Sequence, residues 1–212
     1  MMSNHLIEGA ELVGKYEFPM LKRVDKVDVV ATEAIPFERS YRGKGDGKWV
    51  HFYTHDAKFE CIWNDPGKYL PILQKCKGVI APDYSVYTSF SLSQQIWNTY
   101  RNRALAYWLQ KNGVEVIPNV RWGFEYTYDW CFDGIPKGGT VAVGTNGCIR
   151  NKADRCYFKK GLAKMLKILE PETVIVYGSM PDDIFGKHLD KTKFVNIPHW
   201  RTLLDSQKER CS

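Results

Sequence analysis

The segment GTVAVGTNGCI, residues 139–149, decides the fold that we predict for this chain. Its apolar run at residues 141–143 is typical of a buried β-strand, and the run stops abruptly at Gly144, Thr145, Asn146 and Gly147. A helix is predicted soon afterwards, over residues 154–169, because apolar side chains recur there at helical spacing. A strand, a glycine-bearing loop and a helix in succession favour a ligand site, since glycine lets backbone N–H groups come close to a ligand.

The same succession recurs along the chain and determines the predicted architecture. Short apolar runs predict seven strands, and helical segments separate most of them, which favours parallel pairing. We therefore predict an α/β fold in the form of a compact or incomplete (β/α) barrel with mainly parallel strands. The alternative is an open doubly wound sheet, and in both folds ligands bind at the C-terminal ends of the strands. The predicted strands cover residues 27–31, 49–56, 78–85, 114–122, 140–144, 173–178 and 194–198.

The length of 212 residues predicts one α/β domain over residues 1–212, in which residues 1–25 and 39–48 are irregular or mobile. Residues 39–48 are rich in glycine and cations, so we interpret them either as a phosphate-gripping loop or as a surface hairpin. Pro71 is expected near a helix start, and a terminal helix is expected after His199.

The longest predicted helix covers residues 92–111, with Ser93 as its cap. A wide apolar stripe on it includes Trp97, and the polar Asn98, Arg101 and Asn102 lie on the opposite side.

Charge and composition limit the classes of partner and compartment. The formal net charge of +6 is compatible with phosphate-bearing partners but too mild to indicate nucleic acid by itself. Every apolar stretch falls well short of the ~20 residues that span a membrane, and the N-terminus lacks the layout of a signal peptide. We therefore expect a cytoplasmic protein without a membrane partner.

The six cysteines are expected to be free thiols in a reducing cytosol. A metal site formed by Cys131, Cys148 and Cys156 is an alternative, but their spacing matches no known ligand pattern, so we assign no metal. The sequence identifies no cofactor.

Polar side chains follow the predicted strands, and their convergence at one edge predicts a pocket. Asp83 and His55 are the candidate catalytic residues. The candidate ligand-binding residues are Asp56, Asn119, Arg121, Trp122, Gly144, Thr145, Asn146, Gly147, Tyr177 and Gly178.

For several of these candidates, a purely structural role is the alternative to a role in the site. Asp83 is either a nucleophile or general acid/base, or a cap on the following turn. His55 and its neighbour point to opposite sides of a strand, so they are not expected to form a dyad. Arg121 either clamps a phosphate or carboxylate, or forms a salt bridge to Asp129 or Asp133. Trp122 either stacks on a base or packs in the core.

Seven segments of this chain closely resemble an uncharacterised family found in bacteria, archaea and phages, catalogued as domain of unknown function 4417. The resemblance runs from Trp49 to Gly178. It implies phage or mobile-element cargo that works on nucleic acid, nucleotides or host defence. The segments are WVHFYTHD (49–56), GVIAPDYS (78–85), QIWNTYRNR (95–103), VIPNVRW (116–122), FDGIP (132–136), VAVGTNGC (141–148) and VIVYG (174–178).

A weaker resemblance, at the level of the fold, is to the barrel of the tRNA-guanine transglycosylases, in which strand-end aspartates handle a base. Asp83 and residues 144–147 would occupy such places, but the zinc-ligand pattern and the length of those enzymes are missing.

We predict a soluble protein of phage or mobile-element type that acts on a nucleobase, nucleotide or nucleic acid through this pocket. As an enzyme it would be a nucleoside- or nucleotide-processing transferase or hydrolase. Two alternatives stay open. One is a non-catalytic binder that sequesters a nucleotide signal or a host protein, and the other is a nucleic-acid-binding replication accessory.

Overall fold

The computed structural model describes residues 3–25, 27, 34–199 and 202, and its centre consists of two parallel β-sheets. One sheet has the order β3-β4-β5-β6 and the other β7-β8-β9, and every pair in both is parallel. A single parallel bridge, Asn119 to Ala142, joins them between β6 and β7. The strands are β3 (Ala34–Pro36), β4 (Trp49–His51), β5 (Gly78–Ile80), β6 (Val116–Ile117), β7 (Thr140–Gly144), β8 (Thr173–Tyr177) and β9 (Lys193–Ile197).

The strand order follows the chain order from β3 to β9. A doubly wound sheet requires a reversal of this order, which the described strands do not show. A closed barrel is not confirmed either, because no ladder joins β3 to β9 within the described residues.

The two sheets nevertheless curve towards each other. The rings of His51 on β4 and Tyr177 on β8 have centroids only 4.3 Å apart, whereas strands four positions apart in a flat sheet would be separated by about 19 Å. One apolar cluster, which includes Trp49, Ile117 and Tyr177, draws members from all seven parallel strands.

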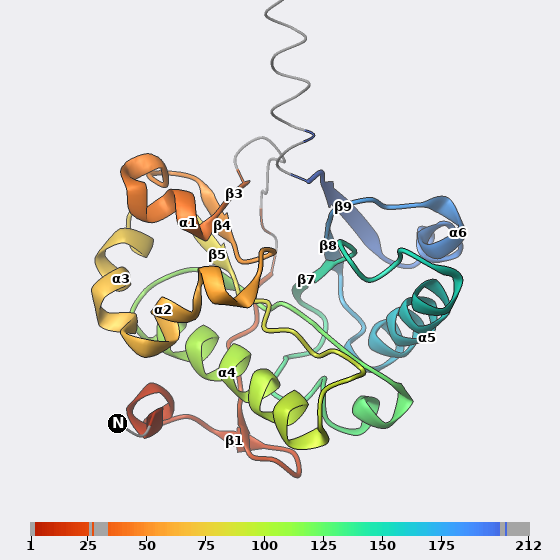
Figure 1. Ribbon diagram of the computed structural model, residues 1–212, viewed down its shortest axis with the longest axis horizontal. Coiled ribbons are helices and arrows are strands. Elements are labelled where there is room, and N and C mark those ends of the chain that lie inside the picture. Colours follow the sequence, from red (N-terminus) through yellow and green to blue (C-terminus); the bar gives the residue numbers. More distant parts are fainter. Residues whose placement is uncertain (1–2, 26, 28–33, 200–201, 203–212) are drawn as a thin grey trace, which may run out of the picture.

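The longer helices lie outside the strands (Figure 1), and two further apolar clusters fill the space between them. The helices are α1 (Phe37–Arg39), α2 (Glu60–Asn64), α3 (Pro66–Leu73), α4 (Leu92–Lys111), α5 (Lys152–Leu169) and α6 (Asp182–Phe185). The shorter helical turns are η1 (Ser3–Ile7), η3 (Ser40–Lys44), η4 (Asp56–Lys58), η5 (Glu125–Asp129) and η6 (Gly186–His188), and an antiparallel pair joins β1 (Leu12–Val13) to β2 (Phe18–Pro19).

Several predicted elements differ from the observed ones. The predicted strands at 49–56, 78–85 and 114–122 end early, after His51, Ile80 and Ile117. After β4 and β5 the backbone bonds to side chains instead, at Tyr53, Pro82 and Ser85, whereas after β6 only the Asn119–Ala142 bridge continues the pairing, with β7. Residues 39–48 contain a π-helical turn, η3, rather than an irregular loop, and none of the side chains described in this segment lines the cleft described below.

Other differences concern helix ends. Pro66, not Pro71, begins α3, and Pro71 lies inside that helix. Ser91, not Ser93, caps α4. Residues 1–25 are less irregular than predicted, since they hold η1 and the β1–β2 pair. Most of the strand predicted at residues 27–31, and the terminal helix, lie outside the described residues.

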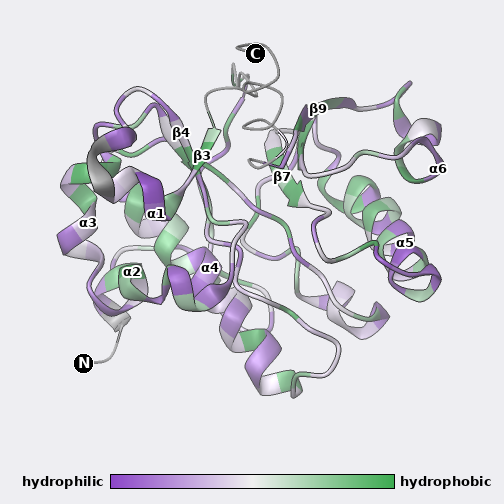
Figure 2. Cartoon of the chain, turned by 45° about the horizontal axis from the view of Figure 1, so that its top comes forward, coloured by the Kyte–Doolittle hydropathy of each residue, from purple (hydrophilic) through white to green (hydrophobic). Residues whose placement is uncertain are grey.

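Helix α4 buries polar side chains together with apolar ones, so its predicted polar side is not the side that faces solvent. Asn98, Arg101 and Asn102 are at most 9 % exposed, whereas Trp97 on the apolar stripe is 45 % exposed. The buried polar side chains bond to the extended chain that follows β5, where Asn98 donates to the carbonyl of Ser85 over 2.6 Å and Asn102 donates to that of Pro82. Beyond Ala81, this segment pairs with no strand in the described part of the chain, so α4 supplies hydrogen bonds that a sheet would otherwise provide. Figure 2 shows the long hydrophilic stretches on α4.

Candidate functional site

A cleft lies at the C-terminal ends of the parallel strands, and it has two adjoining parts. The first part, about 310 Å³, is lined mainly by apolar and aromatic side chains. The second, about 470 Å³, is lined mainly by polar and cationic ones. His55, Ser85, Arg121, Asn146 and Arg150 are among the residues that line both parts, so the two parts form one continuous cleft.

The floor of the polar part is a network centred on the buried Asp83, which is 5 % exposed. Asp83 Oδ1 accepts from Asn119 Nδ2 at 2.8 Å and from Arg121 Nε at 3.0 Å, and Oδ2 is ion-paired with Arg121 Nη2. Burial opposes the charge on Arg121, but the Asp83 carboxylate more than offsets this and raises the Arg121 pKa, so the guanidinium stays charged. The predicted partners of Arg121, Asp129 and Asp133, are therefore wrong; the bidentate partner is Asp83.

Tyr53 connects this network to the inside of the sheet. Its hydroxyl donates to Asn119 Oδ1 at 2.9 Å, and its ring stacks on Tyr177 with centroids 4.6 Å apart. Burial, and then the charge of Asp83, hold the pKa of Tyr53 well above its usual value, so the hydroxyl remains a donor. A Cβ at Gly144 would lie 2.7 Å from the Tyr53 ring, so the glycine makes room for this stack.

His51 lies buried below the polar part, beside Tyr53 and Tyr177. Its Nδ1 accepts the Tyr53 backbone N–H at 3.3 Å, which places the proton on Nε2, and Nε2 finds no hydrogen-bond partner among the residues that the structure describes. Burial, and then the nearby His199, lower the pKa of His51 to about 3, so this imidazole is neutral near neutral pH.

The two candidates that follow β4, His55 and Asp56, lie beyond the end of the strand and have different surroundings. Asp56 turns to the neighbouring strand end, where its carboxylate accepts from the Ser85 backbone N–H at 3.0 Å and from the Ser85 hydroxyl at 2.9 Å. His55 is exposed and lines both parts of the cleft. Asp56 thus fixes the loop after β5, and His55 faces the cleft space.

The glycine loop after β7 forms one wall of the cleft. Thr145 is buried and its hydroxyl donates to the Ser179 carbonyl at 2.8 Å, which ties this loop to the one after β8. Gly178 has φ +106°, and a Cβ there would lie 2.6 Å from Thr145 Oγ1, so this close approach requires glycine. Within the described residues, no hydrogen bond uses the backbone N–H of Asn146 or Gly147, and both residues line the cleft.

Trp122 lines the apolar part but is mostly covered by α5. It is 9 % exposed and packs against Phe158 and Phe132, with ring centroids 5.1 and 6.4 Å away. It therefore supports the wall of the cleft and presents little ring surface. Cys148 also lines the apolar part and accepts a hydrogen bond from Arg121 Nη1.

Sequence reasoning missed several residues that line the cleft, namely Lys58, Tyr87, Arg150, Asp154 and Tyr157. Arg150 could have been found, because it follows Gly147 by three residues in the loop that the sequence singles out. Arg150 is exposed, and no carboxylate within the described residues pairs with it. The other four lie in turns or helices whose direction the sequence does not fix.

Within the described residues, no group of three or more His, Cys, Asp or Glu side chains is arranged to hold a metal ion. Cys131, Cys148 and Cys156 are free thiols that do not form such a group, so the alternative metal site built on them is wrong. In the same part of the chain, every helix is too short or too polar to cross a membrane.

Comparison with known families covers nearly the whole described chain. The model of the family described as domain of unknown function (DUF4417) matches residues 10–197, which contain β1 to β9 and the whole lining of the cleft except His199. The chain belongs to the DUF4417 family. The resemblance inferred from the seven segments is thereby confirmed.

Phage proteins are among the relatives of this DUF4417 chain. The Gene 1 protein of Mycobacterium phage L5 is 33 % identical over 196 residues, which cover 92 % of this chain and 82 % of the relative. The Gene 1 protein of Mycobacterium phage D29 is 32 % identical over 199 residues, which cover 93 % of this chain and 71 % of the relative. The family is thus phage-associated, and no solved structure is significantly similar to this chain.

Proposed function

We propose that the cleft binds a nucleotide unit, with the base in the apolar part and the phosphate at the junction of the two parts. The observation that carries the proposal is the division of one continuous cleft into an aromatic half and a cationic half. Its total size is in the range of small-molecule sites, about 300–1,000 Å³.

The junction offers donors for a phosphate. Arg150 reaches both parts and has no carboxylate partner within the described residues. The backbone N–H groups of Asn146 and Gly147 belong to the same loop and are unused there. Arginine and free backbone N–H groups together are the usual donors for a phosphate oxygen.

In this proposal Asp83 is a positioning residue and not the proton carrier. Both carboxylate oxygens of the buried Asp83 are already engaged, since Oδ1 accepts from Asn119 and Arg121 and Oδ2 pairs with Arg121. Asp83 then holds the Arg121 guanidinium at the floor of the polar part. This favours the binding alternative over acid/base chemistry at Asp83.

If the bound nucleotide is also processed by a transferase or hydrolase activity, His55 is the residue that we assign to proton transfer, because it is exposed and faces both parts of the cleft. His55→Gln would then abolish turnover and leave the dissociation constant of the nucleotide unchanged within about twofold. We also propose that residues 1–212 form a single α/β domain whose strands make an incomplete barrel, which is supported by the apolar cluster shared by all seven strands.

The test is calorimetric titration of the full chain with nucleoside 5′-monophosphates, the matching nucleosides and inorganic phosphate. We expect a monophosphate to bind more tightly than either of its parts. Arg150→Ala should weaken monophosphate binding about tenfold or more, because a charge-assisted hydrogen bond contributes about 1.5–3 kcal/mol, and should leave nucleoside binding unchanged.

Lys164→Ala is the matched control, since Lys164 is an exposed cation on α5 that does not line the cleft. It should change no affinity. Absence of binding by every monophosphate, or equal losses for Arg150→Ala and Lys164→Ala, would contradict the proposal.

A further inference from the structure

We infer that the nucleotide unit belongs to a single-stranded nucleic acid, whose neighbouring bases stack on exposed tyrosines beside the cleft. The inference rests on the proposed function and adds the class of substrate. We call Tyr87, Tyr126 and Tyr157 the tyrosine rim; they are 54 %, 46 % and 37 % exposed. Tyr87 and Tyr157 line the apolar part of the cleft, and Tyr126 lies beyond it.

The members of the rim come from different elements, and ring contacts through Phe124 link two of them, Tyr157 and Tyr126. Phe124 packs edge-on against Tyr157 of α5, with centroids 4.8 Å apart, and lies 6.2 Å from Tyr126 of η5. Aromatic surface therefore continues from the apolar part of the cleft to Tyr126, over a distance longer than one base needs.

A buried side chain holds the rim in place. Gln95 of α4 is fully buried, and its amide nitrogen donates to the carbonyls of Tyr87 at 3.1 Å and Phe90 at 2.9 Å. Its amide oxygen accepts from the Tyr126 hydroxyl at 3.2 Å. One glutamine thus fixes both the loop that carries Tyr87 and the ring of Tyr126. Rings that are exposed and yet fixed are suited to stacking, because little side-chain freedom is lost on binding.

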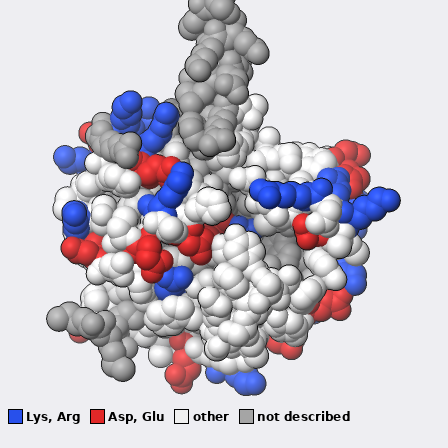
Figure 3. All heavy atoms as spheres, viewed as in Figure 1, with Lys and Arg blue, Asp and Glu red and all other residues white. Residues whose placement is uncertain are grey.

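The surroundings of the rim favour nucleic acid and a single strand. Base–aromatic stacking tolerates any sequence and is combined with cations that follow the backbone, and here Lys58 and Arg150 lie in the adjoining polar part. Figure 3 shows basic and acidic side chains interspersed over this face, without the continuous basic stripe that a duplex backbone favours. An apolar protein partner is the competing reading of exposed tyrosines, and the experiment separates the two.

The experiment measures fluorescence anisotropy of 3′-labelled oligothymidylates of one, four and eight nucleotides, and of an eight-base-pair duplex, with the full chain. We expect the four-nucleotide strand to bind at least tenfold more tightly than the single nucleotide, because each stacked base adds about five- to hundredfold. The duplex should bind more weakly than the strand of equal length.

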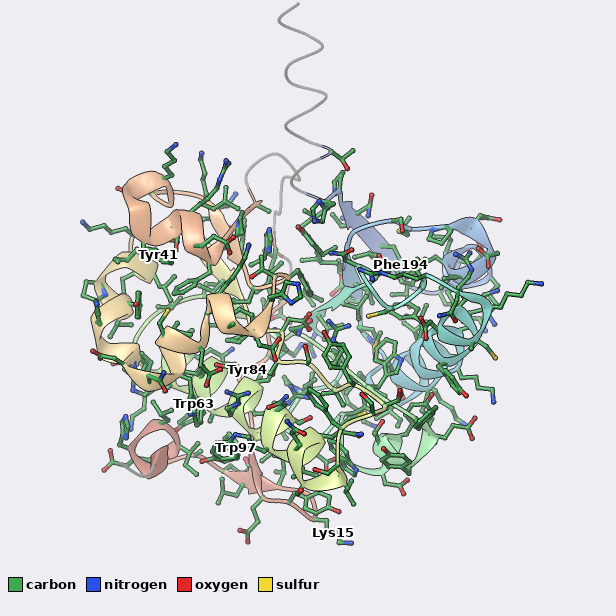
Figure 4. The ribbon with its side chains drawn as sticks, viewed as in Figure 1. Lys15, Tyr41, Trp63, Tyr84, Trp97 and Phe194 are labelled. Atoms are coloured by element: carbon green, nitrogen blue, oxygen red, sulfur yellow. The ribbon has the colours of Figure 1, made fainter. Side chains whose placement is uncertain are left out.

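Variants at Tyr126 test whether the extra affinity of the four-nucleotide strand comes from the tyrosine rim, because Tyr126 does not line the cleft. Tyr126→Ala should weaken binding of the four-nucleotide strand at least fivefold and leave the single nucleotide unchanged, and Tyr126→Phe should retain most of the affinity. Trp97→Ala is the matched control, since Trp97 is 45 % exposed but lies against Trp63 on the outer side of α4 (Figure 4). It should have no effect on either probe, and circular dichroism checks that each variant is folded.

The outcomes separate this inference from the proposed function. If the single nucleotide binds and longer strands bind no more tightly, the inference is wrong and the nucleotide cleft stands. If no probe binds, the proposed function itself fails. If the duplex binds as well as the strand, or if Tyr126→Ala and Trp97→Ala behave alike, the rim does not stack bases and the protein-partner reading replaces it.

Discussion

Gly161 in the middle of α5 offers a direct test of how the wall of the cleft is packed. In Gly161→Ala, the new Cβ would lie 2.5 Å from Cε2 of the Trp122 indole and nearer still to its nitrogen. Trp122 is buried between Phe158 and Phe132. The overlap can therefore be relieved only by moving α5 or these rings.

Two effects of opposite sign compete in this variant. Alanine is preferred over glycine inside a helix by about 1 kcal/mol. Overpacking of a core costs about 1–3 kcal/mol, and an overlap this close should reach the upper end. We therefore expect the free energy of unfolding to fall by about 1–2 kcal/mol. For a chain of this length that corresponds to a Tm lower by about 2–8 °C, measured by circular dichroism.

The control is Gly67→Ala in α3, where the nearest atom to the new Cβ is Asp65 Oδ1 at 3.8 Å. Its Tm should stay level or rise slightly. A double-mutant cycle separates the cost of the overlap with Trp122 from other effects of Gly161→Ala. When Trp122 is already replaced by the smaller Phe, Gly161→Ala should leave the free energy of unfolding unchanged or raise it. The reasoning is refuted if Gly161→Ala alone leaves the Tm level or raises it, or if the loss is the same in both backgrounds.

Three further perturbations follow from buried polar groups. The pKa of His51 is about 3 in the folded state, against 6.5 in the unfolded chain, so between these pH values only the unfolded state binds the proton. The free energy of unfolding should therefore fall by about 1.4 kcal/mol for each pH unit below 6.5. His51→Gln should flatten this slope when unfolding is measured by urea titration at several pH values. Gln95→Leu removes three hydrogen bonds of the tyrosine rim and should cost about 1–2 kcal/mol in thermal unfolding and weaken four-nucleotide binding. Arg103→Met removes the donors to the carbonyls of Cys131 and Asp133. The free energy of unfolding should fall by about 2–4 kcal/mol, because these buried carbonyls lose their partner. A Tm within about 2 °C of the parent would show that Arg103 does not stabilise the fold in this way.

The strands and their order were largely predictable, because strands such as Thr140–Gly144 and Thr173–Tyr177 are buried along their whole length, have apolar centres and end in glycine or polar turns. The grouping of polar residues at the C-terminal ends of the strands was also predictable. In parallel strands the direction of the chain fixes which end carries the loops, so Asp83, Asn119 and Arg121 had to lie at one edge.

What the sequence left open were side-chain partners and orientations. Asp83 and Arg121 are 38 residues apart, and their pairing depends on the two strand ends being adjacent. Trp122 was undecided between stacking and core until α5 was seen to cover it. Arg150, Tyr87 and Tyr126 escaped notice because loop and turn residues have no periodicity from which their direction follows. Tyr157 lies on the predicted helix, but its role depends on what packs around that helix.

The buried polar side chains of helix α4 have a consequence for redesign of this chain. Trp97 is 45 % exposed and makes ring contacts with Trp63 and Tyr100, whereas Asn98 and Asn102 donate hydrogen bonds to the backbone of another segment. A redesign based on hydropathy would replace the exposed Trp97 by a polar residue and the buried Asn98 and Asn102 by apolar residues. On α4 the second of these changes would strip the chain after β5 of its hydrogen bonds, so a redesign guided by hydropathy alone would loosen the floor of the cleft.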